Sequence, residues 1–418
     1  MRSKLQDARC IRRLHILLLV SLPFSLILLG CQNQSSTISF AFAGDVAELA
    51  AYQTLINAFE QAHPDIEIEI RHAPSRQDFQ QKLVTMFDAN QPPDVVLLNY
   101  RRMARFAADG DLQPVTPHLS QIDLDPDAFY PIALQAFTWN DELWCAPQNI
   151  SSLVVYYNQD LFDAAGQPYP QPNWTWDDFL RTAKAITTNE IYGAAIDPGL
   201  YRLAPFVWQA NGVLVDGDEL LPESAENLAA LTWFTELQTV HNVVPNALAA
   251  QSLPADERFL SGGVAMIFES RRFTPIMREV ADFDWDVALL PQGERKAGIL
   301  HSDGYCLGQT PSAETLMFVR FALSEQGQQI LAQTGRTVPS RLAIAESDRF
   351  LNDGQLPMSS HVWLDEVSTL QTVPLHPNWL QFEEMASTEI EEVFYGRISP
   401  IEGLDQIQIQ SGNIQIND

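Results

Sequence analysis

The chain has 418 residues, of which 46% are hydrophobic and 19% are charged, the composition of an ordinary globular protein. This length exceeds what one hydrophobic core usually serves, so we expect two lobes. The net charge of −28 argues against nucleic acid as a partner, because phosphate binding needs basic patches.

The first thirty residues differ in composition from the rest. Basic residues crowd positions 2–13, and a mostly apolar run follows from Leu14 to Leu29. This pattern is typical of a signal peptide, and it is too short and too interrupted for a membrane span. Without residues 1–30 the chain would keep 20 basic and 52 acidic residues, a net charge of −32.

The apolar run ends in the sequence Leu28-Leu29-Gly30-Cys31, and a polar segment follows it. This resembles the lipobox of bacterial lipoproteins, in which a peptidase cuts before a lipidated cysteine. The resemblance implies a lipid on Cys31, a tether at 31–36 and attachment to the outer or periplasmic face of the cell membrane. The alternative is an ordinary signal peptide with a coincidental cysteine.

Strands and helices alternate along the mature chain. Apolar residues alternate with polar or small ones at 38–42 and at 66–70, which predicts strands. Apolar residues at helical spacing predict helices at 49–59 and 79–87. The continuous apolar run at 94–98 is typical of a buried parallel strand, so the pattern predicts an α/β fold.

Two of the four cysteines remain after the predicted processing. Cys10 lies in the signal peptide and Cys31 would carry lipid, which leaves Cys145 and Cys306 in an oxidising compartment. They form a disulfide or remain as two buried free thiols. The chain has no CxxC motif and no Cys/His cluster with zinc spacing, so we expect no metal site.

Five segments of the mature chain carry a common pattern. They are Leu55 to Ile66, Pro93-Asp94-Val95-Val96 with Gly110 and Pro114, Leu143 to Phe179 with its Tyr156-Tyr157-Asn158 and Thr175-Trp176-Asp177, Phe259 to Met266, and Phe318 to Arg341. Taken in order, they resemble family 1 extracellular solute-binding proteins, which include maltodextrin-binding and glycerol-phosphate-binding receptors.

The resemblance implies a two-lobed type II periplasmic-binding-protein fold with a hinge of crossing strands and a ligand cleft between the lobes. It places the crossings near 146–151, 299–304 and 338–342, lobe one at 37–147 and 304–340, and lobe two at 148–303 and 341–418.

The function implied is that of a monomeric receptor that captures a sugar and delivers it to the permease of an ABC importer, without catalysis and without a cofactor. A receptor that feeds a sensor kinase would have the same sequence features. A secreted glycoside hydrolase is the alternative of another class, since acidic pairs such as Asp177-Asp178 could do such chemistry. No catalytic motif supports it.

An anionic polyol, such as a sugar phosphate or glycerol phosphate, is the alternative ligand. Arg101, Arg271 and Arg272 suggest it, because guanidinium groups suit bidentate phosphate contacts. Arg101 also stands where maltodextrin receptors place an acid, and Ser270 replaces a usual glycine, which argues against maltodextrin.

A sugar pocket needs aromatic planes and aimed polar groups. By resemblance, the candidate ligand-binding residues are Asp45, Glu48, Tyr100, Arg101, Asn149, Ser151, Trp208, Glu269, Arg271, Arg272, Ser302, Asp303, Tyr305 and Trp379. In receptors of this fold the first two crossings run antiparallel and side by side. The resemblance therefore implies that Cys145 and Cys306, on the same side of both, are neighbours that can form a disulfide.

Overall fold

The computed structural model describes residues 36–217, 219–351, 354–412 and 414. The predicted signal peptide at 1–30, the lipidation site Cys31 and the tether up to residue 35 lie outside the described residues. In the described part of the chain, no helix is long and apolar enough to cross a membrane.

The elements of the first half follow in chain order. They are β1 (Ser36–Ala43), α1 (Val46–Ala62), β2 (Ile66–Ala73), α2 (Arg76–Asp88), β3 (Val95–Asn99), α3 (Tyr100–Ala108), β4 (Leu112–Gln113), α4 (Pro131–Ala136), β5 (Thr138–Trp139), β6 (Glu142–Leu143), β7 (Cys145–Pro147), β8 (Asn149–Ile150), β9 (Val154–Asn158), α5 (Gln159–Ala164), α6 (Trp176–Ile186) and α7 (Leu200–Gln209).

The second half begins with a short hairpin and ends in two helices. Its elements are β10 (Val215–Asp216), β11 (Glu219–Leu220), α8 (Ala225–Thr239), α9 (Ala247–Ser252), α10 (Ala255–Leu260), β12 (Met266–Glu269), α11 (Thr274–Val280), β13 (Trp285–Ala288), β14 (Gly298–Ile299), β15 (Asp303–Gly308), α12 (Ala313–Leu323), α13 (Glu325–Ala332), β16 (Val338–Pro339), α14 (Leu342–Ala345), α15 (Asp348–Leu351), α16 (Val362–Asp365), β17 (Leu370–Gln371), α17 (Trp379–Phe394) and α18 (Pro400–Ser411).

The first sheet has the order β2-β1-β3-β15-β4, with β7 paired to β15 beside β4. β1 is parallel to β2 and β3, whereas β15 is antiparallel to β3, β4 and β7. The strands and helices predicted between residues 38 and 98 are therefore confirmed as β1, α1, β2, α2 and β3.

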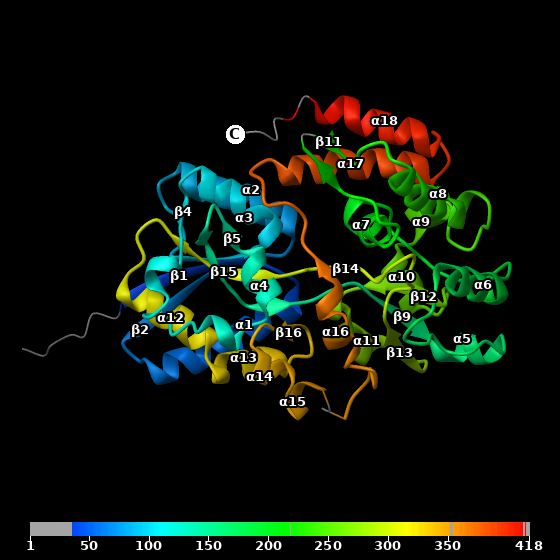
Figure 1. Ribbon diagram of the computed structural model, residues 1–418. Coiled ribbons are helices and arrows are strands. Elements are labelled where there is room, and N and C mark those ends of the chain that lie inside the picture. Colours follow the sequence, from blue (N-terminus) through cyan, green and yellow to red (C-terminus); the bar gives the residue numbers. More distant parts are fainter. Residues whose placement is uncertain (1–35, 218, 352–353, 413, 415–418) are drawn as a thin grey trace, which may run out of the picture. The chain divides into compact units, whose positions relative to one another are not determined.

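Alternating side chains of β1 build a core on each face of this sheet, because successive strand residues point to opposite sides. Phe40 packs with Phe59 of α1 and Phe318 of α12, and its ring centroid lies 5.3 Å from that of Phe318. Ala41 instead belongs to the other hydrophobic core, which includes Phe79 of α2. Figure 1 accordingly shows α1, α12 and α13 on one side of the sheet and α2 and α3 on the other.

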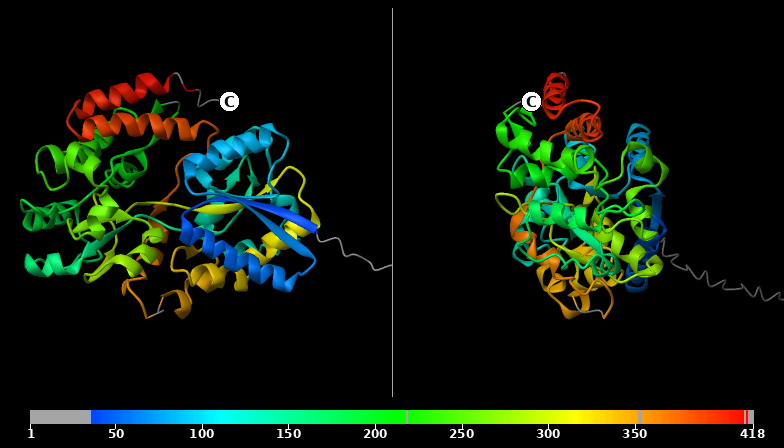
Figure 2. Two further views of the ribbon diagram at one scale, coloured as in Figure 1. Left: turned by 180° about the vertical axis from the view of Figure 1, so that it is seen from behind. Right: turned by 90° about the vertical axis from the view of Figure 1, so that its right-hand side faces the viewer.

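The second sheet is antiparallel, with β9 between β12 and β13. All five residues of β9 are buried, as its run of apolar and aromatic residues predicts. α7, α8, α17 and α18 pack against one another beyond this sheet, and α17 and α18 lie side by side in both views of Figure 2.

Three extended segments connect the two sheets. The first segment contains β8 and the third contains β16. These two strands pair antiparallel, with Ile150 opposite Val338. The first and second segments are joined by backbone hydrogen bonds from Gln148 N–H to Asp303 O and from His301 N–H to Ser151 O, both 2.8 Å. After β16, α14 packs against α13 before the chain returns to the second sheet's helices.

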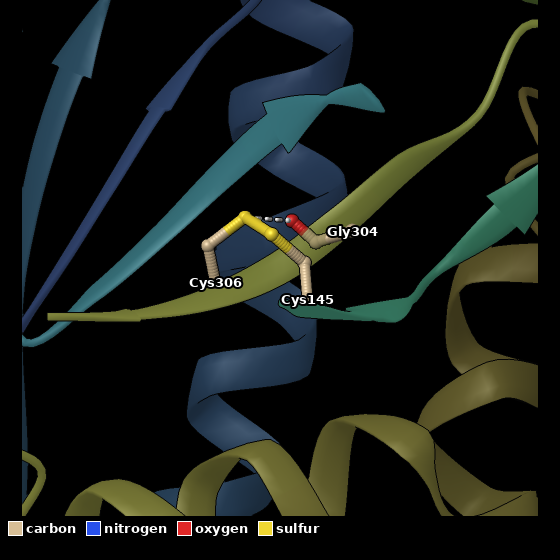
Figure 3. The surroundings of a disulfide bond; sticks show 3 residues. All are labelled: Cys145, Gly304 and Cys306. Atoms are coloured by element: carbon tan, nitrogen blue, oxygen red, sulfur yellow. Dashed lines mark hydrogen bonds between the residues drawn. A yellow bond between two sulfur atoms is a disulfide. The ribbon is translucent and has the colours of Figure 1, made fainter. Parts of the chain in front are cut away.

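Cys145 and Cys306 are bonded through their sulfur atoms. They are directly opposed residues of the antiparallel strands β7 and β15, with Cα atoms 4.2 Å apart, and both are fully buried. Figure 3 shows the bond spanning the two strands. It joins segments 161 residues apart within the first sheet and does not cross to the second.

Candidate functional site

A polar cavity of about 550 Å³ is lined by residues from both sheets. Eight of the fourteen predicted ligand-binding residues line it: Asp45, Glu48, Arg101, Asn149, Ser151, Glu269, Arg272 and Asp303. They lie at or just after the carboxyl ends of β1, β3 and β12, including the first turns of α1 and α3, and on the crossing segments.

Glu48 binds two arginines from distant parts of the chain. Its Oε2 accepts hydrogen bonds from Arg272, at 2.6 Å, and from Arg336, at 3.1 Å. Arg336 also donates to Asp45, at 2.7 Å, and Asp45 caps α1 by accepting from the Glu48 N–H. Burial raises the pKa of Glu48, and the two guanidinium groups oppose that rise. Glu48 thus ties the first helix to the loop after β12.

A second ion pair closes another part of the cavity wall. Nη1 of Arg101 on α3 donates to both carboxylate oxygens of Glu383 on α17, at 3.0 and 2.9 Å. The guanidinium of Arg101 also lies 5.7 Å from the ring centroid of Tyr201, and that of Arg202 lies 5.2 Å from it. Arg202 in turn forms an ion pair with Glu269.

The crossing segments place amide and carboxylate groups together. Asn99 Nδ2 donates to Asp303 Oδ1 at 3.1 Å, and the Asp303 N–H donates to Asn149 Oδ1 at 3.1 Å. These bonds hold Asp303 in position at the cavity wall. Nearby, burial and the charges of Arg101, Arg202 and Arg272 lower the pKa of His301 well below its usual value, so its ring is neutral at pH 7.

Three predicted aromatic residues do not line the cavity, because each is buried elsewhere. The hydroxyl of Tyr100 accepts a hydrogen bond from the Val373 N–H, at 3.1 Å. Tyr305 packs in the core of the first sheet, 6.0 Å from Phe40 between ring centroids. Trp208 packs in the hydrophobic core that surrounds α7.

The other three predicted residues outside the lining are supporting residues. The guanidinium of Arg271 is fully buried, 4.5 Å from the ring centroids of both Phe350 and Trp363. Ser302 Oγ donates to the Asn149 carbonyl, at 2.5 Å. Trp379 is buried, and its Nε1 donates to Glu383 Oε2 at 3.2 Å, so it holds a cavity residue in place.

Several residues of the lining were not predicted from the sequence. They include Arg76, Arg102, Asp197, Tyr201, Arg202, Asp256, Phe273, Ile276, His301, Arg336, Thr337 and Glu383. Tyr201 and Trp208 lie on the same helix, α7. The end of α7 that carries Tyr201 faces the cavity. Glu383 follows Trp379 by one helical turn, so its face of α17 could have been inferred from that residue.

Two α/β lobes joined by three crossing segments, with a polar cavity lined from both, define a two-lobed ligand-binding receptor. The model of the bacterial extracellular solute-binding protein family matches residues 43–329, and the chain belongs to this family. The predicted family and fold class are therefore confirmed.

Similar proteins cover nearly the whole chain. A protein of Brucella abortus (strain 2308), named as a binding protein, is 21% identical over 385 residues, 87% of this chain and 91% of the relative. The solved structure of the ABC substrate-binding protein Lmo0181 from Listeria monocytogenes in complex with cycloalternan has a TM-score of 0.83 and 23% identity, over 91% of this chain and 98% of that one. The structure of UgpB from Mycobacterium tuberculosis in complex with glycerophosphocholine has a TM-score of 0.81 and 20% identity over the same shares.

Proposed function

We propose that this chain is the receptor of an ABC importer, which captures a sugar or oligosaccharide in the cavity between its lobes and delivers it to a membrane permease. The observation that supports this proposal is the composition of the cavity lining. The ring of Tyr201 lies there near the guanidinium groups of Arg101 and Arg202, which are paired with carboxylates. A sugar offers apolar C–H faces to such a ring and hydroxyl groups that both donate and accept hydrogen bonds.

Unpaired polar atoms of lining residues support a hydroxyl-rich ligand. Among the described residues, His301 Nε2, Thr337 Oγ1, and Nε and Nη1 of Arg336 are buried without a hydrogen-bond partner. Buried polar groups are normally paired with protein or ordered water. A bound ligand with hydroxyl groups, together with the water it orders, would supply partners at this wall.

The proposal includes motion of the lobes about the crossing segments. Lobe one would comprise 37–147 and 304–340, and lobe two 148–303 and 341–418. The disulfide lies within the first sheet, so it leaves hinge motion free. The ion pairs of Glu48 with Arg272 and of Arg101 with Glu383 would form when the lobes close.

We also propose that the protein is secreted and held at the membrane by lipid on Cys31, after removal of residues 1–30. The polar segment after Cys31 would act as a tether to the part of the chain that the structure describes, whose first element is β1. A lipoprotein carries a diacylglyceryl unit and an N-acyl chain, which meets the requirement of two acyl signals for stable anchoring.

Isothermal titration of the mature protein tests the ligand class. The panel contains neutral mono- and oligosaccharides and, for each monosaccharide, its phosphate and its uronate. At least one carbohydrate should bind saturably with one site per chain, and Tyr201→Ala should weaken it. A panel in which no carbohydrate, neutral or anionic, gives saturable heat would contradict the proposal.

A further inference from the structure

Six arginines line the cavity, and they fall into two groups. Four of them, Arg101, Arg202, Arg272 and Arg336, form ion pairs with carboxylates of the lining. The side chains of Arg76 and Arg102 make no hydrogen bond or ion pair with any residue in the described part of the chain.

The two unpaired arginines lie at the same end of the cavity. Arg76 is the first residue of α2 and Arg102 is the third residue of α3, so they follow β2 and β3, the two strands that flank β1 in the first sheet. Both also line a small hollow of about 30 Å³, and this hollow shares four further residues with the main cavity: Glu48, Asn99, Arg272 and Asp303. Their helices begin here, which adds partial positive charge to this end.

The charge of Arg102 is poorly compensated where it stands. Burial and the positive charge of Arg101 lower the pKa of Arg102, and they outweigh the attraction of Glu383, Asp303 and Glu384. A partly desolvated guanidinium is costly unless an anion pairs with it. Arg101, Arg271 and Arg272, which suggested an anionic ligand from the sequence, are engaged by protein groups instead.

We infer that this end of the cavity binds the anionic group of a sugar-class ligand, a phosphate or a carboxylate, with Arg102 and Arg76 as the donors. The inference rests on the proposed function and narrows its ligand to an acidic carbohydrate. The guanidinium fork matches both anions with two parallel hydrogen bonds. A neutral hydroxyl group would bring no opposite charge to either arginine.

Matched ligands test the inference by isothermal titration. Glucose, glucose 6-phosphate and glucuronate form one set, and glycerol with glycerol 3-phosphate forms another. In a set that binds, the anionic member should bind at least about tenfold more tightly than the neutral member. The affinities for glucose 6-phosphate and for glucuronate show whether the site prefers a phosphate or a carboxylate.

Variants locate the anion. Arg102→Gln should reduce the preference for the anionic member by about tenfold, and Arg76→Gln should reduce it in the same direction. Arg105→Gln is the matched control, because Arg105 lies on the same helix, does not line the cavity and pairs with Asp109 at its exposed face. Circular dichroism and the melting temperature verify that each variant is folded.

Equal affinity for the neutral and the anionic ligand of a set would overturn the inference of an anion site. It would not contradict the proposed function as a sugar receptor. A preference that survives in both Arg102→Gln and Arg76→Gln would overturn the location. If no carbohydrate of either kind binds, the proposed function fails as well. Should Arg102→Gln not fold, Arg102→Lys keeps the charge without the fork and should lose part of the preference.

Discussion

Arg101 and Glu383 are 282 positions apart in the chain, yet Nη1 of the arginine donates to both oxygens of the carboxylate. Arg101 stands on the helix that follows a strand of the first sheet, and Glu383 stands on α17, among the helices beyond the second sheet. Trp379 supports the carboxylate from the same helix. The pair therefore ties two distant parts of the fold at the edge of the cavity.

The first prediction is that Glu383→Gln destabilises the protein. The change leaves the partly buried guanidinium of Arg101 without its anion, and hydrogen bonds to charged groups contribute about 1.5–3 kcal/mol. The free energy of unfolding in urea should fall by that amount. Glu384→Gln, at the exposed neighbouring position, should change it by less than about 0.5 kcal/mol. Equal effects of the two changes would contradict a specific role for the ion pair.

The second prediction is that Tyr201→Ala weakens ligand binding, because Tyr201 supplies an aromatic ring to the cavity wall, near the guanidinium groups of Arg101 and Arg202. Loss of one aromatic contact should reduce affinity by about tenfold or more. Tyr169→Ala, at a tyrosine that does not line the cavity, is the control.

Trp208→Ala and Trp379→Ala should act differently from Tyr201→Ala. Both indoles are buried outside the lining, so their loss should lower the melting temperature before it changes affinity. Unfolding curves and titrations of the same preparations separate the two effects. A normal affinity in Tyr201→Ala would remove that ring from the site.

The third prediction concerns the disulfide. Thiol counting on denatured, unreduced protein should find no free thiol at Cys145 or Cys306, and peptide mapping by mass spectrometry should recover the linked pair. Reduction should lower the free energy of unfolding by up to roughly 4–5 kcal/mol, because the bond closes a loop of 161 residues. Ligand affinity should change less, since the bond does not span the cavity. Two titratable thiols at these positions would contradict the bond.

The fourth prediction is a pH dependence that comes from Glu366. Burial raises the pKa of Glu366 to about 8, and a hydrogen bond from the Ser152 hydroxyl opposes the rise. Between pH 4.5 and 8 the folded protein therefore holds a proton that the unfolded chain has lost. This contribution to stability is full below pH 4.5 and is lost as the pH rises through 8.

Glu366→Gln measures that contribution, because the amide resembles the protonated acid. The free energy of unfolding of the variant, minus that of the wild type, should grow by about 1.4 kcal/mol per pH unit across this range. Asp365→Asn, at the exposed preceding residue, is the control for removing one acidic residue from this segment. A constant difference between Glu366→Gln and the wild type would mean that Glu366 is ionised in the folded protein.

The fifth prediction concerns the anchor. The native protein should partition into detergent, and Cys31→Ser should leave it unprocessed or release it from the membrane. Mass spectrometry of the mature protein should find lipid on an N-terminal Cys31. An unmodified N-terminus at another residue would exclude the lipoprotein.

The amino-acid sequence determined the architecture because its patterns are local. The apolar alternation of β1 sends Phe40 and Ala41 to opposite faces of a sheet, whatever packs there. Cys145 and Cys306, which lie beside the first two crossing segments, likewise indicated where these distant parts of the chain meet. Eight cavity residues could be predicted because they follow strand ends or lie on crossings, positions that the family pattern marks.

Only the tertiary structure decided which side chains face the cavity. α7 is buried almost all round, and both Tyr201 and Trp208 are aromatic, so residue type does not separate the ring at the cavity from the ring in the core. Arg271 and Arg272 are adjacent, yet one stacks on Phe350 and Trp363 while the other reaches Glu48. The partners of these residues come from distant segments, and local periodicity carries no information about which segment will stand opposite.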